Sequence, residues 1–244
     1  MGNMLSTLQG QHVVVVGGTS GIGKGIANAF VNLGATIIAT GGTQKEVEAA
    51  QSIDTPGIDF QYLDVRSDES VDAFFFSLSR LHVLVNCAGV IKRGEEHDPK
   101  VFASVIDVNL TGSMRTCSAA RRLLKESSGC IINTASMLSF FGGGLVPGYS
   151  ASKGGVVQLT KSLAVAYAAD GIRVNAVAPG WIATPLTQAL QDDPVRSGPI
   201  LARTPMGRWG TPEDVAGPVL FLASTLARFV TGVVLPVDGG YLVS

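Results

Sequence analysis

Short apolar, β-branched runs alternate with segments of helical spacing along the whole of this 244-residue chain. The runs that predict strands are His12–Val16, Ala35–Thr40, Ile58–Leu63, Val83–Asn86, Cys130–Ala135, Arg173–Ala178 and Gly232–Val237. The segments between them that predict helices are Ile22–Leu33, Glu69–Leu78, Val101–Lys125, Tyr149–Ala169 and Pro212–Ala223. Most strand runs are apolar at both alternating positions, as expected when helices cover both faces of a sheet. The pattern predicts the α/β class, with a doubly wound parallel sheet and right-handed crossovers.

Composition favours one domain over residues 1–244. Hydrophobic residues make up 46% of the chain and charged residues 15%, and no polar linker or internal repeat divides it. One stretch, Gly180–Thr211, is rich in proline and glycine and has room for a short helix at Thr187–Asp192. It follows the predicted strand Arg173–Ala178, so it lies at the carboxyl edge of the sheet, where such folds bind ligands. We interpret residues 180–211 as a substrate lid, the alternative being an irregular surface loop.

Charge and hydropathy exclude several classes of partner. The formal net charge of −1 provides no basic field for a phosphate backbone, so nucleic acid is not expected. No stretch is long and apolar enough to span a bilayer, so no membrane partner is expected. The stretch Met1–Gly10 has neither the basic start nor the apolar core of a secretion signal, which predicts a cytoplasmic protein.

The cysteines and histidines do not form a metal-binding pattern. Cys87, Cys117 and Cys130 lack C-x-x-C spacing and are expected to be free, buried thiols. The three histidines lie far apart in the sequence with no carboxylate pattern around them. No metal site is predicted.

A glycine-rich turn follows the first predicted strand and opens the first predicted helix. Its residues are Gly17-Gly18-Thr19-Ser20-Gly21-Ile22-Gly23. Without Cβ atoms, the backbone can turn sharply and approach a pyrophosphate, while the helix N-terminus stabilises negative charge. A turn in this context predicts a dinucleotide site in a Rossmann-type fold.

Three residues downstream of the turn predict proton transfer to or from oxygen. Tyr149 and Lys153 are four residues apart on a predicted helix, so their side chains share a face. A nearby ammonium favours the phenolate and is expected to bring the phenol's pKa closer to neutral. Ser136, at the end of a predicted strand, is placed to hydrogen-bond a substrate oxygen. A serine hydrolase is excluded, because Ser136 lacks a nucleophile elbow and a histidine base.

The chain resembles the short-chain dehydrogenase/reductase family over essentially its whole length. The matching motifs are Gly17–Gly23, Asp64-Val65, Asn86-Cys87-Ala88-Gly89, Asn109, Ser136, Tyr149–Lys153 and Pro179-Gly180. The resemblance implies that Tyr149 is the general acid/base, that Ser136 orients the substrate oxygen, and that Lys153 lowers the tyrosine pKa and binds ribose. It implies that Asn109 holds a water in a proton relay. It also implies a homotetramer, with the helices 101–125 and 149–169 and the region 238–241 at interfaces.

The same resemblance implies a nicotinamide cofactor. The cofactor-binding residues it implies are Gly17, Thr19, Ser20, Gly21, Ile22, Gly23, Thr40, Gly41, Asp64, Val65, Asn86, Ala88, Gly89, Tyr149, Lys153, Pro179, Gly180, Ile182 and Thr184. Thr40–Thr43, at the end of the second predicted strand, offers neither the acidic residue that selects NAD nor an arginine that selects NADP. Lys24 and Lys45 are the nearest basic residues, and Ser20 stands where relatives that use NADP often carry a basic residue. We expect NAD as the cofactor, with NADP as the alternative.

Three stretches are most similar to the sugar-acid branch of that family, which contains 2-deoxy-D-gluconate 3-dehydrogenase and gluconate 5-dehydrogenase. They are Ala135–Phe140, Ile91-Lys92-Arg93, and Gly207–Gly210 through Pro218. The predicted substrate-binding residues are Ser136, Tyr149, Lys92, Arg93, Met137 and Trp181. Lys92 or Arg93 could pair with a substrate carboxylate, or both could belong to a solvated loop balanced by Glu95, Glu96 and Asp98. The alternatives are a 3-oxoacyl-carrier-protein reductase or another carbonyl reductase, and a dinucleotide-binding protein without turnover.

Overall fold

The computed structural model describes residues 5–53 and 55–244, apart from the side chain of Ser6. Residues 1–4, part of the stretch interpreted above as lacking a secretion signal, lie outside the described residues. The described chain forms a seven-stranded sheet in the order β3-β2-β1-β4-β5-β6-β7, and all its neighbouring strands are parallel. The strands are β1 (His12–Val16), β2 (Thr36–Gly41), β3 (Ile58–Tyr62), β4 (Val83–Asn86), β5 (Cys130–Thr134), β6 (Arg173–Pro179) and β7 (Val234–Val237). The prediction of a doubly wound parallel sheet is confirmed.

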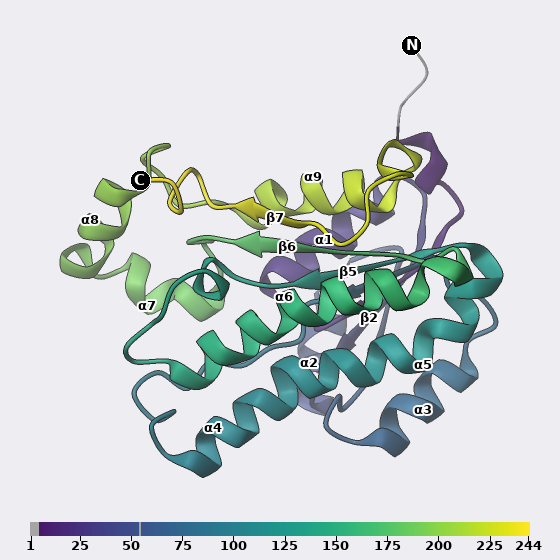
Figure 1. Cartoon of the computed structure of the whole chain (residues 1–244), viewed down its shortest axis with the longest axis horizontal. Coiled ribbons are helices and arrows are strands. Elements are labelled where there is room, and N and C mark those ends of the chain that lie inside the picture. Colours follow the sequence, from purple (N-terminus) through teal and green to yellow (C-terminus); the bar gives the residue numbers. More distant parts are fainter. Residues whose placement is uncertain (1–4, 54) are drawn as a thin grey trace.

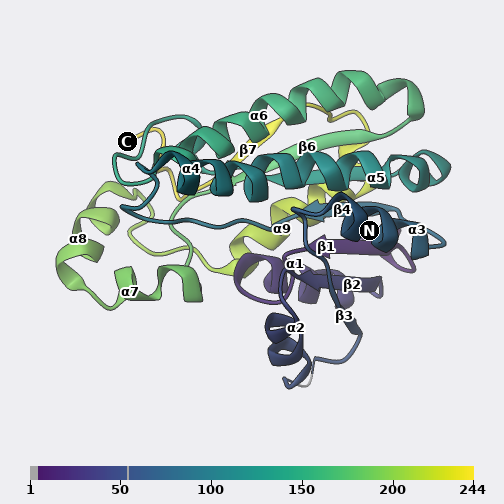
Figure 2. The same ribbon diagram turned by 90° about the horizontal axis from the view of Figure 1, so that it is seen from below.

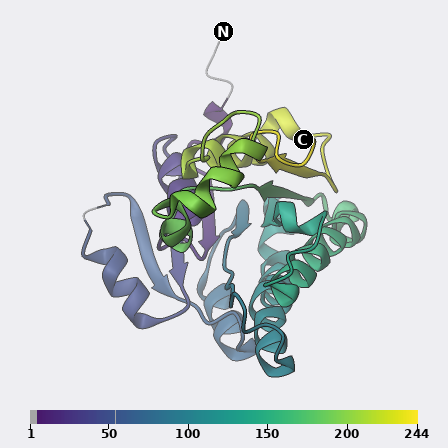
Figure 3. The same ribbon diagram turned by 90° about the vertical axis from the view of Figure 1, so that its left-hand side faces the viewer.

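Helices cover both faces of this sheet (Figures 1 and 3). The α-helices are α1 (Gly21–Val31), α2 (Gln44–Gln51), α3 (Asp68–Ser77), α4 (Pro99–Ile106), α5 (Gly112–Ser127), α6 (Pro147–Tyr167), α7 (Gln188–Gln191), α8 (Pro194–Arg203) and α9 (Pro212–Ala223). Shorter 3₁₀ turns are η1 (Ser6–Leu8), η3 (Met137–Ser139), η4 (Ala168–Asp170), η5 (Pro185–Thr187) and η6 (Thr225–Ala227). A π-helical segment, η2 (Asp107–Thr111), joins α4 to α5.

Alternate residues of each central strand enter two separate cores. In β1, Val13 and Val15 pack with α1 and α9, whereas Val14 and Val16 pack with α3, α5 and α6. Both alternating positions are therefore buried, which explains why the strand runs read as continuously apolar. Burial of so many branched side chains on both faces, at about 25 cal/mol per Å², is the main force that holds the layers together.

Three helical predictions were wrong in detail. The helix predicted over 101–125 is α4, η2 and α5, so its course contains one wider turn. The helix α2 was not predicted; it begins at a capping box in which Thr43 accepts from the Glu46 amide and Glu46 accepts from the Thr43 amide. In the lid, the short helix predicted at 187–192 is divided into η5 and α7, and the longer helix α8 was missed. Its Pro194 occupies the first turn after the N-cap Asp193, where proline favours a helix.

The order of the strands determines where a ligand can bind. The chain runs outward from β1 to β3 and then returns to β4 on the other side of β1, so the connections diverge above β1 and β4. Such a switch point opens a crevice at the carboxyl ends of the strands. The helices α7 and α8 extend from the body of the molecule as a separate arm (Figure 2). Among the described residues, no helix is long and apolar enough to cross a membrane.

Candidate active site

A cavity of about 450 Å³ lies at the carboxyl edge of the sheet. Turns that follow six strands contribute to its wall, so it opens at the switch point between β1 and β4. The residues that line it are Val16, Gly17, Thr19–Gly23, Gly41–Thr43, Glu46, Leu63–Arg66, Cys87–Val90, Val108, Thr134, Tyr149, Lys153 and Thr184–Leu186. The same cavity is lined by the turn after β2, where an adenosine is expected, and by the Tyr149–Lys153 pair.

The glycine turn forms one wall and lacks room for side chains. Gly17 and Gly21 have φ angles of +77° and +51°, in the left-handed region that favours glycine. A Cβ on Gly17 would lie 2.5 Å from the Ala88 nitrogen, and one on Gly23 would collide with the Gly17 carbonyl. Ser20, at the N-cap of α1, makes no side-chain capping bond, which leaves the first amides of α1 for another acceptor. This wall fits the pyrophosphate of a dinucleotide.

The turns after β2 and β3 form the adenosine end of the cavity. Glu46 accepts hydrogen bonds from the Gly42 amide at 2.8 Å and the Thr43 amide at 3.2 Å, so its carboxylate is fixed beside the cavity. Arg66 donates from Nε and Nη2 to both oxygens of Asp64, at 2.9 and 2.8 Å. This hydrogen bond lowers the pKa of Asp64. Among the described residues that line the cavity, Arg66 carries the only guanidinium, and a carboxylate already engages it.

Most of the predicted cofactor residues line this cavity, and five do not. Thr40 and Asn86 are buried inside the sheet, where Asn86 bonds to Asn133 and Thr116. Pro179 and Gly180 end β6, and a Cβ on Gly180 would lie 2.7 Å from the Asp238 Cα. Ile182 is buried and lines a second cavity, of about 360 Å³, on the far side of that connection. These five support the walls and do not face the space inside.

Tyr149 and Lys153 lie together in the wall, near the start of α6. The Lys153 Nζ is 5.6 Å from the centre of the Tyr149 ring and donates to the Thr134 carbonyl at 2.7 Å. Ser136, just beyond β5, hydrogen-bonds Tyr149 and also accepts from the Leu138 amide at 3.2 Å. The structure therefore places the three predicted catalytic side chains together, two of them on α6 and one at the start of η3.

The direction expected for the tyrosine pKa was wrong for this structure. Burial raises the pKa of Tyr149, and the hydrogen bond with Ser136 opposes that rise. Burial also lowers the pKa of Lys153 to about 8. Lys153 is 4% exposed, so its ammonium loses hydration, and it gains no carboxylate partner within the described residues. The two pKa values therefore move apart, because burial disfavours the phenolate of Tyr149 and the ammonium of Lys153 alike.

Asn109 is fully buried in η2, beneath the catalytic pair. Its Oδ1 accepts from the Val90 amide at 2.8 Å, and its Nδ2 donates to the Val90 carbonyl and to Ser152 Oγ, both at 3.0 Å. Both amide protons are thereby used within the protein. A water in a relay could therefore bond to Asn109 only by donating to one of its oxygens.

The predicted substrate-binding residues are spread over a wider area. Met137 is buried in η3, and Trp181 lies in the second cavity, edge-on to Trp209 and Tyr241 at 5.8 and 6.4 Å. Lys92 and Arg93 are exposed and line neither cavity. The alternative of a solvated loop does not extend to Glu96, because that residue is 1% exposed.

Sequence reasoning missed several residues that line the large cavity. Glu46 and Thr43 carried a signal, since T-x-x-E is a capping box just after the second strand. Cys87 was expected to be buried, but it is half-buried and lines the cavity, 3.3 Å from Thr134 Oγ1. Pro185 and Leu186 show that the first part of the segment 180–211 reaches the cavity. No local pattern distinguished Pro185 and Leu186 from ordinary loop residues.

Comparisons with known proteins agree with this geometry. A family model described as enoyl-(acyl carrier protein) reductase matches residues 16–242. The chain is 43% identical to the 2-dehydro-3-deoxy-D-gluconate 5-dehydrogenase of Bacillus subtilis, over 97% of this chain and 96% of that protein. It is 39% identical to a 3-oxoacyl-acyl-carrier-protein reductase of Chlamydia pneumoniae, over 96% of this chain and 98% of that protein.

A solved structure shares the whole fold. The putative NAD(P)-dependent gluconate 5-dehydrogenase of Beutenbergia cavernae, described with bound NADP, superposes with a TM-score of 0.90 at 40% identity. The match covers 98% of this chain and 99% of that one. The chain belongs to the short-chain dehydrogenase/reductase family, and it is an NAD(P)-dependent oxidoreductase acting on CH–OH groups.

Proposed function

We propose that this oxidoreductase interconverts a secondary alcohol and a ketone on a sugar acid, with Tyr149, Ser136, Lys153 and Asn109 as its catalytic set. The observation that carries the proposal is that Tyr149 and Lys153 line the same cavity as the glycine turn, with Ser136 beside Tyr149. A hydroxyl acid, its orienting hydroxyl and a cation at the end of a dinucleotide cleft are the parts that carbonyl reduction needs.

Each side chain has a separate task in this proposal. A bound nicotinamide supplies or accepts the hydride. In oxidation the Tyr149 phenolate takes the proton of the substrate hydroxyl, and in reduction the phenol returns it. Ser136, which already bonds Tyr149, holds the substrate oxygen within reach of the same phenol. Lys153, fixed on the Thr134 carbonyl, places a positive charge beside the phenolate as it forms.

The substrate class rests on the relatives and on unpaired cations at the loop after β4. Lys92 and Arg93 have no ion pair within the described residues. Their loop is held against the loop after η3, because the Gly94 amide donates to the Leu145 carbonyl at 2.8 Å. Arginine suits a carboxylate because its guanidinium binds both oxygens. We assign the substrate carboxylate to Lys92 or Arg93.

The adenosine end favours NAD over NADP. The relative from Beutenbergia cavernae was described with NADP, so the comparisons do not favour NAD for this chain. Within the described wall, however, Glu46 is fixed beside the cavity and Arg66 is paired with Asp64. A carboxylate accepts a bond from the ribose 2′-hydroxyl and repels a 2′-phosphate.

The lid and the assembly complete the proposal. Residues 180–211 form a lid on a single domain, since Thr184–Leu186 already reach the cavity. A homotetramer would cover exposed apolar side chains on two of the expected interface helices, among them Met114 on α5 and Val165 on α6, which are 38% and 81% exposed.

A 3-oxoacyl-carrier-protein reductase is the second candidate, because a relative with that name is 39% identical. An acidic carrier protein would need free basic residues around the cleft. Arg208 is paired with Asp214, and Arg203 is stacked on Phe141 and Tyr241. Two of the three lid arginines are therefore already engaged.

A substrate panel tests these assignments. Aldonates, deoxyaldonates, polyols, simple ketones and 3-oxoacyl thioesters are assayed with both cofactors, by absorbance of the reduced nicotinamide. Turnover of a sugar acid is expected, and the Tyr149→Phe variant should lose at least ~100-fold in rate while it keeps its cofactor affinity. Preference for the thioester would favour the second candidate, and a fully active Tyr149→Phe enzyme would remove Tyr149 from its role.

A further inference from the structure

Glu96 is a buried carboxylate beside the catalytic helix. It lies in the loop after β4 and is 1% exposed. Its Oε1 accepts from the Lys92 amide at 2.8 Å, and its Oε2 accepts from the Tyr149 amide at 2.7 Å. No ion pair involves Glu96 within residues 5–53 and 55–244. A buried charge held only by backbone amides is costly, so a specific role is expected for it.

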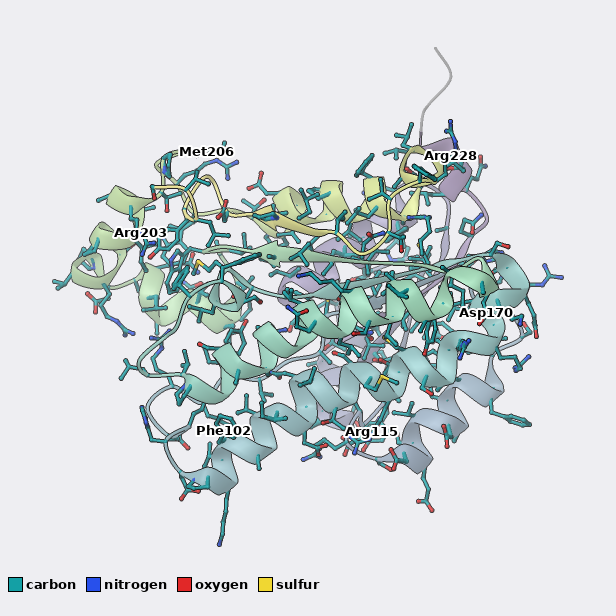
Figure 4. The ribbon with its side chains drawn as sticks, in the orientation of Figure 1. Phe102, Arg115, Asp170, Arg203, Met206 and Arg228 are labelled. Carbon is teal, nitrogen blue, oxygen red and sulfur yellow. The ribbon has the colours of Figure 1, made fainter. Side chains whose placement is uncertain are left out.

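The start of α6 offers Glu96 both an unpaired amide and the space for its carboxylate. Tyr149 lies in the first turn of α6, where amides lack partners within the helix. Val146, at the N-cap, provides no side-chain capping bond. Glu96, from a distant loop, provides instead the acceptor that the Tyr149 amide needs. A Cβ on Gly148 would lie 3.3 Å from Glu96 Oε2 and 3.2 Å from the ring of Phe102 on α4, which Figure 4 labels. Gly148 thus leaves space for the carboxylate.

Both ends of the Tyr149 peptide backbone are therefore held. The amide is held by Glu96, and the carbonyl accepts from Ser152 Oγ at 2.7 Å. Ser152 in turn accepts from Asn109, which is bonded to Val90. Glu96 and Asn109 are each anchored to the loop after β4, at Lys92 and Val90. Tyr149 is connected by two routes to the same loop.

We propose that Glu96 is a positioning residue for Tyr149, and that it sets the register between the catalytic helix and the loop that carries Lys92 and Arg93. This inference rests on the proposed role of Tyr149 in proton transfer. Misplacement of a reacting group by about 1 Å can cost ~100-fold in rate, so a fixed backbone amide matters here.

The charge of Glu96 has a second, separable effect. Three polar groups act on the phenol: Ser136 and Lys153 lie beside the ring, from the start of η3 and from α6, and Glu96, from the loop after β4, acts from its place at the Tyr149 backbone amide. The negative charge of Glu96 adds to burial in raising the pKa of Tyr149. Removal of that charge should therefore move the alkaline rise of the oxidation rate to lower pH, because less alkali is needed to form the phenolate.

The test uses three variants of the full chain. In Glu96→Gln the carboxamide accepts from one amide, but its NH₂ group faces the other amide and repels it. We expect kcat to fall at least ~10-fold, with the pH midpoint of oxidation moved to lower pH. Glu96→Asp keeps the charge but is too short to reach both amides, so kcat should fall while the midpoint stays. Glu95→Gln, at the exposed neighbouring position, should match the wild type in both.

NADH affinity, read by fluorescence, should be unchanged in all three variants, because Glu96 does not line the cofactor cavity. A wild-type kcat in Glu96→Asp or Glu96→Gln overturns the positioning role. If Glu96→Gln does not fold, the Glu96→Asp kcat alone decides. Failure of the proposed function can be told apart from failure of the positioning role. In the first case the Tyr149→Phe enzyme would be active, whatever the Glu96 variants do.

Discussion

The ammonium of Lys153 donates a 2.7 Å hydrogen bond to the carbonyl oxygen of Thr134, at the last residue of β5. This bond ties α6 to the centre of the sheet. Lys153 is 4% exposed and its ammonium has no ion pair with a carboxylate in the described chain, so the cation is unfavourable where it lies. The proposed reaction, and not stability, accounts for a lysine at this position.

Lys153→Met should abolish activity while the protein keeps or gains thermal stability at pH 7. Burial lowers the pKa of Lys153 from 10.5 to about 8, a shift worth about 3 kcal/mol. Because the folded pKa lies below the unfolded one, the unfolded state binds more protons between pH 8 and 10.5, and wild-type stability rises with pH there relative to the variant. Urea denaturation of both proteins at pH 7.5 and 9.5 measures this; a constant difference between them would contradict it.

Oxidation should be much faster at pH 9 than at pH 7, and reduction should not be. Burial raises the pKa of Tyr149, so the phenol stays protonated at neutral pH. The phenolate fraction then rises about tenfold per pH unit below that pKa, and oxidation needs the phenolate. Initial rates in both directions from pH 6 to 10 provide the measurement. An oxidation rate that is flat over this range would mean that another step or group limits the reaction.

His82 should make the protein less stable in mild acid. Its Nδ1 accepts from the His12 amide at 2.9 Å, and burial lowers its pKa, with His12 and Arg80 adding to the effect. The folded state therefore favours neutral His82, and the stability that this provides is lost as pH falls below the unfolded pKa and through the folded one. In His82→Asn an acceptor oxygen remains without a titrating ring, so its stability should depend less on pH between 7 and 5. Thermal melts of the wild type and of His82→Asn at several pH values provide the comparison. If the melting temperatures of both proteins fall equally with pH, His82 is not the source of the loss of stability in acid.

Glu46→Gln should narrow the preference for NADH over NADPH. The carboxylate is fixed by the amides of Gly42 and Thr43, at the edge of the adenosine end. Loss of an exposed charge is worth only a small factor, so NADPH affinity should rise ~3-fold while NADH affinity changes less. Fluorescence titration of both reduced cofactors measures the ratio, and Glu48→Gln is the matched control, because Glu48 lies two residues further along α2 and does not line the cavity. Tighter binding of NADPH than NADH by the wild type would contradict the preference itself.

Local sequence patterns were sufficient to predict the strands and the glycine turn. Buried β-branched runs predicted all seven strands to within two residues at each end, because both faces of the sheet are covered. The glycine turn was recognisable because its spacing and context are set by backbone sterics, as the close approach of Gly17 to Ala88 illustrates. The helix α8 was missed because proline suggests a loop, whereas Pro194 lies where a helix tolerates it.

Contacts between distant segments could not be predicted. From the sequence, Glu96 entered only the alternative of a charged surface loop, and only its tertiary partner, the Tyr149 amide, makes it a buried acceptor. Lys153 was expected to act on Tyr149 from the same helix face, but its ammonium points to Thr134 and burial dominates both pKa values. Burial is a property of the whole fold, so its effect on a pKa cannot be obtained from spacing alone.

The π-helical segment η2 makes the site depend on the length of the chain as well as on its side chains. It inserts one extra residue into a helix that otherwise runs from α4 to α5. Each residue of an α-helix turns the chain by about 100°, so deletion of Val108 would rotate α4 against α5 and turn Asn109 away from Val90 and Ser152. The chain would keep every catalytic side chain and still lose their alignment.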